Sequence, residues 1–170
     1  MILFHGSFLP VPKPIIIRSD VGRDFGFAFY VTEIREQADR WALRKARLEQ
    51  RNGHLDAKPT VSVYDFDATA ARQVLKWLDF PEADMVWLEM VLSCRGNKNY
   101  SHGQDIVSGK ITDDKVGATV TFVQQGIMRK EDAIERLKFQ KINSQIAFCT
   151  EHALRFLSYR DFYHPEEEQP

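Results

Sequence analysis

The sequence has only two cysteines, Cys94 and Cys149, and no CxxC pair. It therefore offers neither the spacing of a zinc site nor a disulfide framework. No stretch approaches 18 uninterrupted apolar residues, and the first residues are strand-like rather than charged and then apolar. We expect no metal site, no membrane span, and two buried thiols in a reducing, cytoplasmic compartment.

The common glycine-rich nucleotide motifs are also missing. Neither GxGxxG nor GxxxxGK[ST] occurs, which disfavours a Rossmann or P-loop site. Charge of one sign is not in excess, because 23 basic and 24 acidic residues leave a net charge of −1, whereas general nucleic-acid binders are usually basic. With 44% hydrophobic residues the chain can bury a core. We expect one domain over residues 1–163 and a disordered acidic tail over residues 164–170.

Short apolar segments and amphipathic segments follow one another without strict alternation, which predicts an α+β fold rather than a doubly wound sheet. Apolar and branched residues predict strands at 2–6, 27–31, 59–66, 104–109 and 144–149, with a short edge strand at 15–17. Helical spacing and caps predict helices at 33–51 (capped by Thr32), from Asp67 to 78, and at 81–94, 113–125, 130–138 and 150–158.

Three side chains suggest a site for a flat ring on a ribose. His5 and Gly6 end the first predicted strand, where an imidazole can bond a ribose hydroxyl and a glycine admits a ligand to the backbone. Tyr30 ends the next predicted strand, and Trp41 lies eleven residues further on. A ring at either position can stack on a heterocycle. Each of these residues alone is more often structural, so the argument depends on their joint pattern.

That joint pattern resembles the nicotinamide pocket of ADP-ribosyltransferases of the poly(ADP-ribose) polymerase type. The resemblance implies two packed, mostly antiparallel sheets with surrounding helices and a cleft for NAD. It implies that His5 binds ribose and Gly6 the carboxamide, while Tyr30 and Trp41 bracket the nicotinamide ring. It extends the NAD-binding set to Ser7 and Thr32.

Further segments are similar to the bacterial domain-of-unknown-function family 3990, which is itself ADP-ribosyltransferase-like. The segments that carry this resemblance are Leu3-Phe4-His5-Gly6, Asp24 to Thr32, Gln104 to Gly109 with Asp113-Asp114 after it, and Asn143 to Thr150. Two positions depart from the family pattern. Ala28 stands where glycine is usual, and Phe27 stands where lysine is common.

The late strand lacks the glutamate that polymerase-type transferases place against the ribose. Alternation along residues 144–149 puts Gln145 and Ala147 on one face and Ser144 on the other. We assign Gln145 to the pocket, with Ser144 as the alternative if the register differs by one residue. A neutral glutamine favours mono-transfer or slow turnover, or an inactive NAD-binding module, because it supplies no negative charge to an oxocarbenium-like state.

Several charged residues have more than one interpretation. Arg23 is a candidate for contact with the pyrophosphate of NAD, and the alternative is that Arg23 and Asp24 form a solvated loop pair. Arg44, Lys45 and Arg47 are predicted to form the solvated outer face of the first long helix. Asp105, Asp113 and Asp114 lack the additional ligands of a metal site.

The expected function is that of an NAD-dependent mono-ADP-ribosyltransferase. It is expected to be a bacterial toxin or effector with His5, Tyr30 and Gln145 at the reaction centre and NAD as co-substrate. The expected partners are a protein or nucleic-acid acceptor and, by the family resemblance, a neutralising antitoxin protein. The alternatives are an inactive NAD-binding module and an enzyme like the RNA 2′-phosphotransferases, which would need more basic residues around the cleft than the sequence places there.

Overall fold

The structure is a computed structural model, and it describes residues 1–18, 23–97, 99–110, 114–138 and 144–166. In this part of the chain there are two β-sheets and six helices. The strands are β1 (Ile2–Ser7), β2 (Phe29–Val31), β3 (Thr60–Phe66), β4 (Trp77–Phe80), β5 (Ile106–Lys110), β6 (Ser144–Phe148) and β7 (Leu157–Tyr163). The helices are α1 (Arg35–Arg51), α2 (Ala68–Val74), α3 (Met85–Gly96), α4 (Asp114–Gln124), α5 (Lys130–Lys138) and α6 (Glu151–Leu154).

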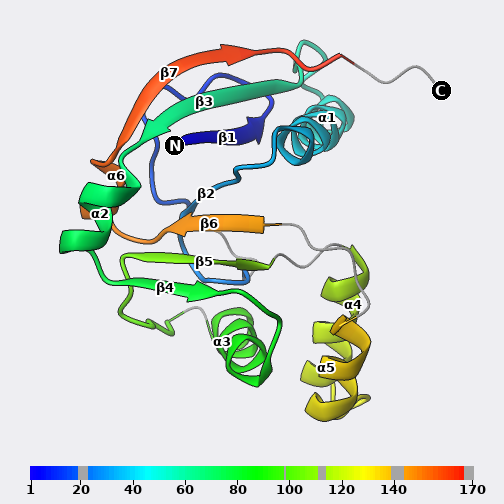
Figure 1. The fold of residues 1–170 in the computed structure, drawn as a ribbon. Helices are drawn as coiled ribbons and strands as arrows, with labels where there is room; N and C mark the ends of the chain where they lie inside the picture. The colour runs from blue at the N-terminus through cyan, green and yellow to red at the C-terminus, as the bar shows by residue number, and fades with distance from the viewer. Residues whose placement is uncertain (19–22, 98, 111–113, 139–143, 167–170) are drawn as a thin grey trace.

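The two sheets are mostly antiparallel, as the resemblance implied. The first sheet has the order β1-β3-β7 and is antiparallel throughout. The second has the order β2-β6-β5-β4, and only β4 and β5 run parallel, with α3 in the connection between them. Figure 1 shows the sheets one above the other, with α1 beside β1 and α3 beneath the second sheet. The fold is therefore mixed α/β with two mostly antiparallel sheets.

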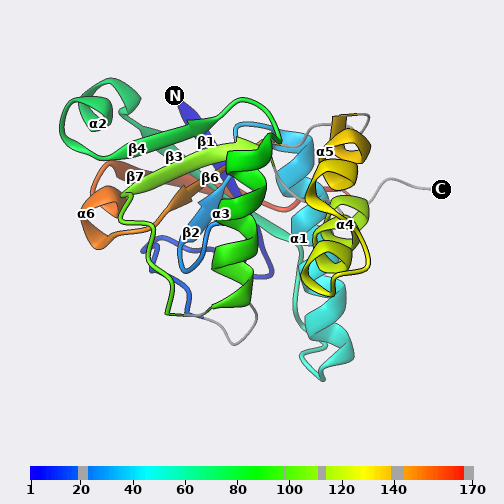
Figure 2. The same ribbon diagram turned by 90° about the horizontal axis from the view of Figure 1, so that it is seen from below.

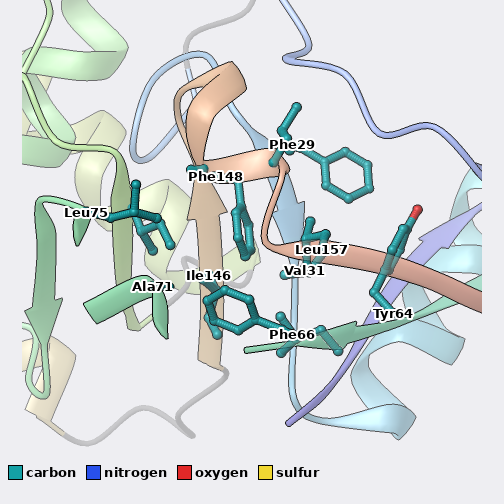
Figure 3. Packing of buried hydrophobic residues seen from close by; sticks show 13 residues of the cluster. Phe29, Val31, Tyr64, Phe66, Ala71, Leu75, Ile146, Phe148 and Leu157 are labelled. Carbon is teal, nitrogen blue, oxygen red and sulfur yellow. The ribbon is translucent and has the colours of Figure 1, made fainter. Parts of the chain in front are cut away.

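The sheets meet at β1 and β2 and enclose a common core. Phe4 and Thr32 exchange backbone hydrogen bonds of 2.8 and 2.9 Å, which tie the edge of the first sheet to the end of β2. Phe29 and Val31 of β2 pack with Tyr64 of the first sheet and Phe148 of β6 (Figure 3). Because alternate residues of a strand point to opposite faces, Tyr30 and Thr32 are left for the other side of β2.

A second apolar cluster lies on that other side of the second sheet. Trp87, Leu88 and Val91 of α3 are fully buried there against Val107 of β5 and Ala147 of β6. Figure 2 shows α3 crossing this face of the sheet, with α4 and α5 beside it. Among the described residues, no helix has the length and apolar character that a membrane-spanning segment needs.

Several helices and strands of the structure differ in type or length from those predicted. The helix predicted from Asp67 to residue 78 ends at Val74, because Trp77–Phe80 pairs with β5 as β4. The helix predicted over 150–158 ends at Leu154, because Leu157–Tyr163 pairs with β3 as β7. The predicted edge strand at 15–17 is reduced to one bridge. The prediction for the acidic tail falls partly on residues 167–170, which lie outside the described residues.

The first helix also differs from its prediction at both ends. Thr32 does not cap it: the N-cap position is Ile34, which has no side-chain cap bond. Leu48, an apolar residue of this helix, is 54% exposed, whereas the buried residues are Gln37 and the three alanines Ala38, Ala42 and Ala46. This face of alanines lets α1 approach β1 closely.

Candidate functional site

A cavity of about 200 Å³ lies between α1, the meeting point of the two sheets, and the segment that precedes β2. Its walls come from β1, β2, α1, β6, α3 and the loop around Arg23. The lining residues are Phe4, His5, Gly6, Ile17, Arg23, Asp24, Tyr30, Val31, Thr32, Gln37, Ala38, Trp41, Lys45, Arg95 and Gln145. Segments far apart in the sequence thus meet in one hollow.

His5 is buried at the edge of the core, where its ring packs on Phe29 with centroids 4.4 Å apart. Its Nδ1 lies 2.7 Å from the carbonyl oxygen of Tyr30. Since a carbonyl only accepts, Nδ1 carries the hydrogen and donates it. Burial lowers the pKa of His5 from 6.5 to about 4, against the effect of this hydrogen bond, which raises it. At neutral pH the ring is therefore uncharged, and its Nε2 is a hydrogen-bond acceptor.

Gly6 is the point at which α1 touches β1. A Cβ atom added there would lie 2.3 Å from the carbonyl oxygen of Ala38 and 2.8 Å from the backbone nitrogen of Ala42. The helix backbone thus occupies the side-chain position of Gly6, and only glycine fits. The space beside this glycine is taken by α1 and does not serve the approach of a ligand, which corrects the reason inferred from the sequence.

The backbone of Gly6 nevertheless points toward the cavity side of β1. Phe4 uses its N–H and C=O to bond Thr32, on the edge of β1 that lies away from β3. Backbone groups alternate in direction along a strand, so Gly6 presents its N–H and C=O to that same edge.

Tyr30 and Trp41 line the cavity from two elements, β2 and α1. The Tyr30 hydroxyl donates to the carbonyl oxygen of Gly26 at 2.5 Å, which fixes the ring. Burial raises the pKa of Tyr30 well above 10, so its hydroxyl stays protonated. The guanidinium carbon of Arg23 lies 5.6 Å from the centre of the Tyr30 ring. The guanidinium group of Arg23 thus makes a cation–π contact with the Tyr30 ring. The Trp41 side chain is less enclosed, with 39% of its surface exposed.

Three basic side chains and one acidic side chain line the cavity: Arg23, Lys45, Arg95 and Asp24. Asp24 is buried and paired with Arg95, whose Nη2 and Nε lie 2.6 and 2.8 Å from its Oδ1. Burial lowers the pKa of Lys45, and the nearby charge of Arg23 lowers it further. Arg23 and Lys45 are thus two like charges at one cavity, an arrangement that an anion would stabilise.

Further polar groups at the cavity come from Thr32, which follows β2, from β6 and from the start of α1. Thr32 is buried and donates from its hydroxyl to the carbonyl of Ser144 at 2.8 Å, and Gln37 donates from Nε2 to the same oxygen at 3.0 Å. Gln145 pairs with Gly109 in the sheet and lines the cavity. The cavity wall on β6 therefore contains Gln145, not the alternative Ser144.

Two side-chain atoms in the described residues are buried without a hydrogen-bond partner, and both belong to residues that line this cavity. They are Nε of Arg23, a donor, and Oε1 of Gln37, an acceptor. Buried polar atoms are rarely left unpaired in folded proteins. Their position at the cavity indicates a site for a polar ligand.

Seven of the eight residues assigned to the site from the sequence line one cavity, namely His5, Gly6, Arg23, Tyr30, Thr32, Trp41 and Gln145. The structure does not bring Ser7 to it, because Ser7 is buried and paired with Thr60 in the first sheet. The interpretation of Asp24 as a partner of Arg23 in a solvated loop was wrong, since Asp24 is buried against Arg95.

Three polar residues that line the cavity were not among the site candidates drawn from the sequence: Gln37, Lys45 and Arg95. Lys45 was placed on the solvated face of α1, but it is half-buried and lines the cavity. Its spacing contained the signal, since Gln37, Trp41 and Lys45 follow one another at intervals of four and so share one side of a helix. Nothing in the sequence connects Arg95 of α3 with the site.

The absence of a metal site, expected from the sequence, can be examined only in the described part of the chain. Within it, no group of three or more histidine, cysteine or acidic side chains could hold a metal ion. Cys94 is buried and Cys149 is half-buried, and both are free thiols. Burial raises the pKa of each thiol to about 12, so neither is a thiolate at neutral pH.

Comparison with known proteins gives one match. No curated protein and no solved structure matches the chain significantly. One family model, described as "Protein of unknown function (DUF3990)", matches residues 1–159, which include every residue that lines the cavity. The chain belongs to the DUF3990 family of proteins of unknown function.

Proposed function

We propose that this protein is an NAD-dependent mono-ADP-ribosyltransferase with a macromolecular acceptor, acting as a bacterial toxin or effector. The observation that carries the proposal is the meeting of His5, Tyr30 and Trp41 around one cavity. They were singled out together from the sequence for their resemblance to a nicotinamide pocket. An antitoxin protein as a neutralising partner belongs to the same proposal and follows only from that resemblance.

The cavity suits the pyridine end of NAD. Its volume of about 200 Å³ is below the roughly 300–1,000 Å³ of pockets that bury a whole drug-sized ligand, so it would take one end of the dinucleotide. The N–H and C=O of Gly6 form a donor and acceptor pair of the kind that a carboxamide needs. Tyr30 and Trp41 supply two aromatic rings on which a positively charged heterocycle could stack.

The remaining parts of NAD have matching partners. His5 is uncharged at neutral pH and keeps Nε2 as an acceptor for a ribose hydroxyl, since Nδ1 is occupied by Tyr30. Arg23 and Lys45 offer positive charge to the diphosphate, and a diphosphate would relieve their mutual repulsion. The pairing of Asp24 with Arg95 keeps the one carboxylate among the described lining residues from opposing that charge.

The reaction is a substitution at the ribose carbon that bears nicotinamide. The bond from this carbon to the ring nitrogen breaks, and its electron pair leaves with neutral nicotinamide. A nucleophilic atom of the acceptor forms the new bond and gives up its proton. His5, Gly6 and Tyr30 hold the ring and ribose in the reacting orientation. Gln145 contributes a dipole but no charge, which suits a single slow transfer better than chain elongation.

Two alternatives use the same cavity. The three basic residues Arg23, Lys45 and Arg95 favour an enzyme like the RNA 2′-phosphotransferases, which would use NAD and a phosphorylated RNA. The absence of an unpaired carboxylate among the described lining residues favours an inactive NAD-binding module.

Incubation with NAD tests the proposal and separates the alternatives. NAD labelled in its adenylate part is incubated with the protein and a cell lysate, and released nicotinamide and label on protein and nucleic-acid fractions are measured. The proposal predicts both release and transfer. Binding by calorimetry without release would identify the inactive module. Release that depends on an added 2′-phosphorylated RNA would identify the phosphotransferase.

A matched pair of histidine variants links the activity to the cavity. The His5→Ala variant is expected to lose NAD binding and release. The His54→Ala variant, which changes an exposed histidine paired with Glu49, is expected to keep both. Circular dichroism of both variants checks that they fold. An unchanged signal in folded His5→Ala protein would refute the assigned pocket.

A further inference from the structure

A row of arginines runs along the outer face of α1. Arg40, Arg44, Arg47 and Arg51 are all exposed, and together with Leu43 and Leu48 they line a surface groove. At 3.6 residues per turn these four arginines lie within about 60° of one another around the helix axis, over a length of about 16 Å. We refer to these four residues as the arginine stripe.

The charge of α1 is concentrated on this face. The 17 residues of the helix include six basic and three acidic side chains, a net charge of +3 in a chain with a net charge of −1. Two of the three carboxylates are bonded elsewhere: Asp39 accepts from the Tyr163 hydroxyl at 2.6 Å, and Glu49 pairs with His54 at 2.8 Å. The third, Glu36, belongs to the first turn, before the stripe begins.

The stripe borders the candidate site. Gln37, Trp41 and Lys45 of the same helix line the cavity, and they follow the next row of side chains around the helix. Arg44 connects the two rows, since its guanidinium carbon lies 5.6 Å from the centre of the Trp41 ring. Figure 2 shows the C-terminal part of α1 extending past the other elements.

We propose that the arginine stripe binds the backbone of a single-stranded nucleic acid and delivers it to the adjacent cavity as the acceptor. The charge of the stripe is complementary to a polyanion. Guanidinium groups bond phosphate in bidentate fashion, and their planes also stack on unpaired bases. A linear row of positive charge along a groove, which Leu43 and Leu48 also line, corresponds to the positively charged grooves by which proteins track the backbone of a single strand.

The role as acceptor rests on the proposed transferase function, whereas the binding surface does not. An acidic protein is the competing occupant of such a surface. The regular row of arginines favours a repeating phosphate backbone, because a nucleic acid presents one negative charge at every nucleotide along its length.

Fluorescence anisotropy without NAD tests the surface. The probes are labelled single-stranded oligonucleotides of mixed sequence, one of DNA and one of RNA, and a labelled acidic peptide. The Arg40→Gln/Arg51→Gln variant removes two charges from the stripe. The Arg136→Gln/Arg155→Gln variant removes two exposed charges from α5 and the residue after α6, and serves as a control of equal net charge.

Loss of two phosphate contacts lowers the salt slope of single-strand binding by about 1.4, which corresponds to roughly 25-fold weaker binding at 0.1 M salt. We expect this change in the stripe variant and not in the control. Equal weakening in both variants, tighter binding of the peptide than of either oligonucleotide, or no oligonucleotide binding by the unchanged protein would overturn the proposal. The comparison of DNA with RNA identifies the sugar that is read.

A second readout separates the surface from the chemistry. With labelled NAD, the unchanged protein is expected to transfer label to the bound oligonucleotide. The stripe variant is expected to transfer several-fold less while it releases nicotinamide at the same rate without acceptor. If nicotinamide is released but the oligonucleotide gains no label, the stripe is not an acceptor site. If no nicotinamide is released at all, the transferase function fails and the binding surface stands on its own result.

Discussion

The contact between Gly6 and α1 gives the sharpest prediction about the architecture of the site. A Cβ atom at Gly6 would lie 2.3 Å from the carbonyl oxygen of Ala38, whereas real Cβ atoms essentially never come within 3.0 Å of such a neighbour. The Gly6→Ala variant must therefore move β1 and α1 apart by about 0.7 Å at this point. The two nearest atoms belong to the helix backbone and the third is Cβ of Trp41, so no side-chain rotation relieves the contact.

Overpacking of this kind costs about 1–3 kcal/mol. In a chain of this length each kcal/mol lowers the melting temperature by about 2–4 °C. We expect the melting temperature of Gly6→Ala to fall by roughly 2–12 °C in a calorimetric or circular-dichroism scan. NAD binding is also expected to weaken, because Trp41 and Lys45 on α1 move away from Tyr30.

Gly117→Ala provides the control. Gly117 lies inside α4 with no atom within 4 Å of an added Cβ, so the substitution removes a helix glycine at no steric cost. It is expected to stabilise the protein by about 0.5–1 kcal/mol. A Gly6→Ala variant as stable as Gly117→Ala would refute the packing argument and return Gly6 to a role in ligand approach.

Three further predictions concern charge at the cavity. Burial lowers the pKa of His5 from 6.5 to about 4, so the imidazole binds a proton more readily in the unfolded chain than in the folded one. Stability therefore rises with pH in this range. The contribution of His5 to the free energy of unfolding is complete above pH 6.5 and falls by about 3 kcal/mol as the pH decreases to 4. Denaturant titrations should show that His5→Gln lacks this part of the pH dependence, and an identical dependence would contradict the assigned burial. Asp24→Asn is expected to lower stability by about 3–5 kcal/mol, because it removes the buried carboxylate that pairs with the guanidinium of Arg95, while loss of the exposed pair in Arg129→Gln should leave the melting temperature unchanged. Gln145→Glu is expected to raise nicotinamide release about tenfold or more by placing a carboxylate beside the reacting ribose, and slower release would count against Gln145 as the residue at the reaction centre.

The sequence predicted the elements whose local pattern and tertiary environment agree. Two elements were predicted correctly because their segments have no competing pattern. They are the strand Thr60–Phe66, with its alternating residues, and the charged, uninterrupted helix Lys130–Lys138. The strands β4 and β7 were missed because each continues an apolar helical pattern, and only pairing with β5 and β3 selects the extended form. Pairing between distant strands cannot be read from a local window.

Some residues of the candidate site could likewise be predicted from the sequence, and others could not. His5 and Tyr30 could be placed by the resemblance of their joint pattern, and Gln145 by strand alternation along residues 144–149; all three line the cavity. Lys45 and Arg95 could not, because their place depends on how α1 and α3 dock against the sheets. The close approach of α1 comes from Gly6 and two alanines, which give no chemical signal of a site.

The most direct test of the central claim is a crystal structure of the protein with bound NAD or nicotinamide. The account predicts the pyridine ring between Tyr30 and Trp41, its carboxamide paired with the backbone of Gly6, and the ribose hydroxyl at Nε2 of His5. A dinucleotide bound elsewhere on the protein, or bound with its pyridine ring outside this cavity, would contradict the account.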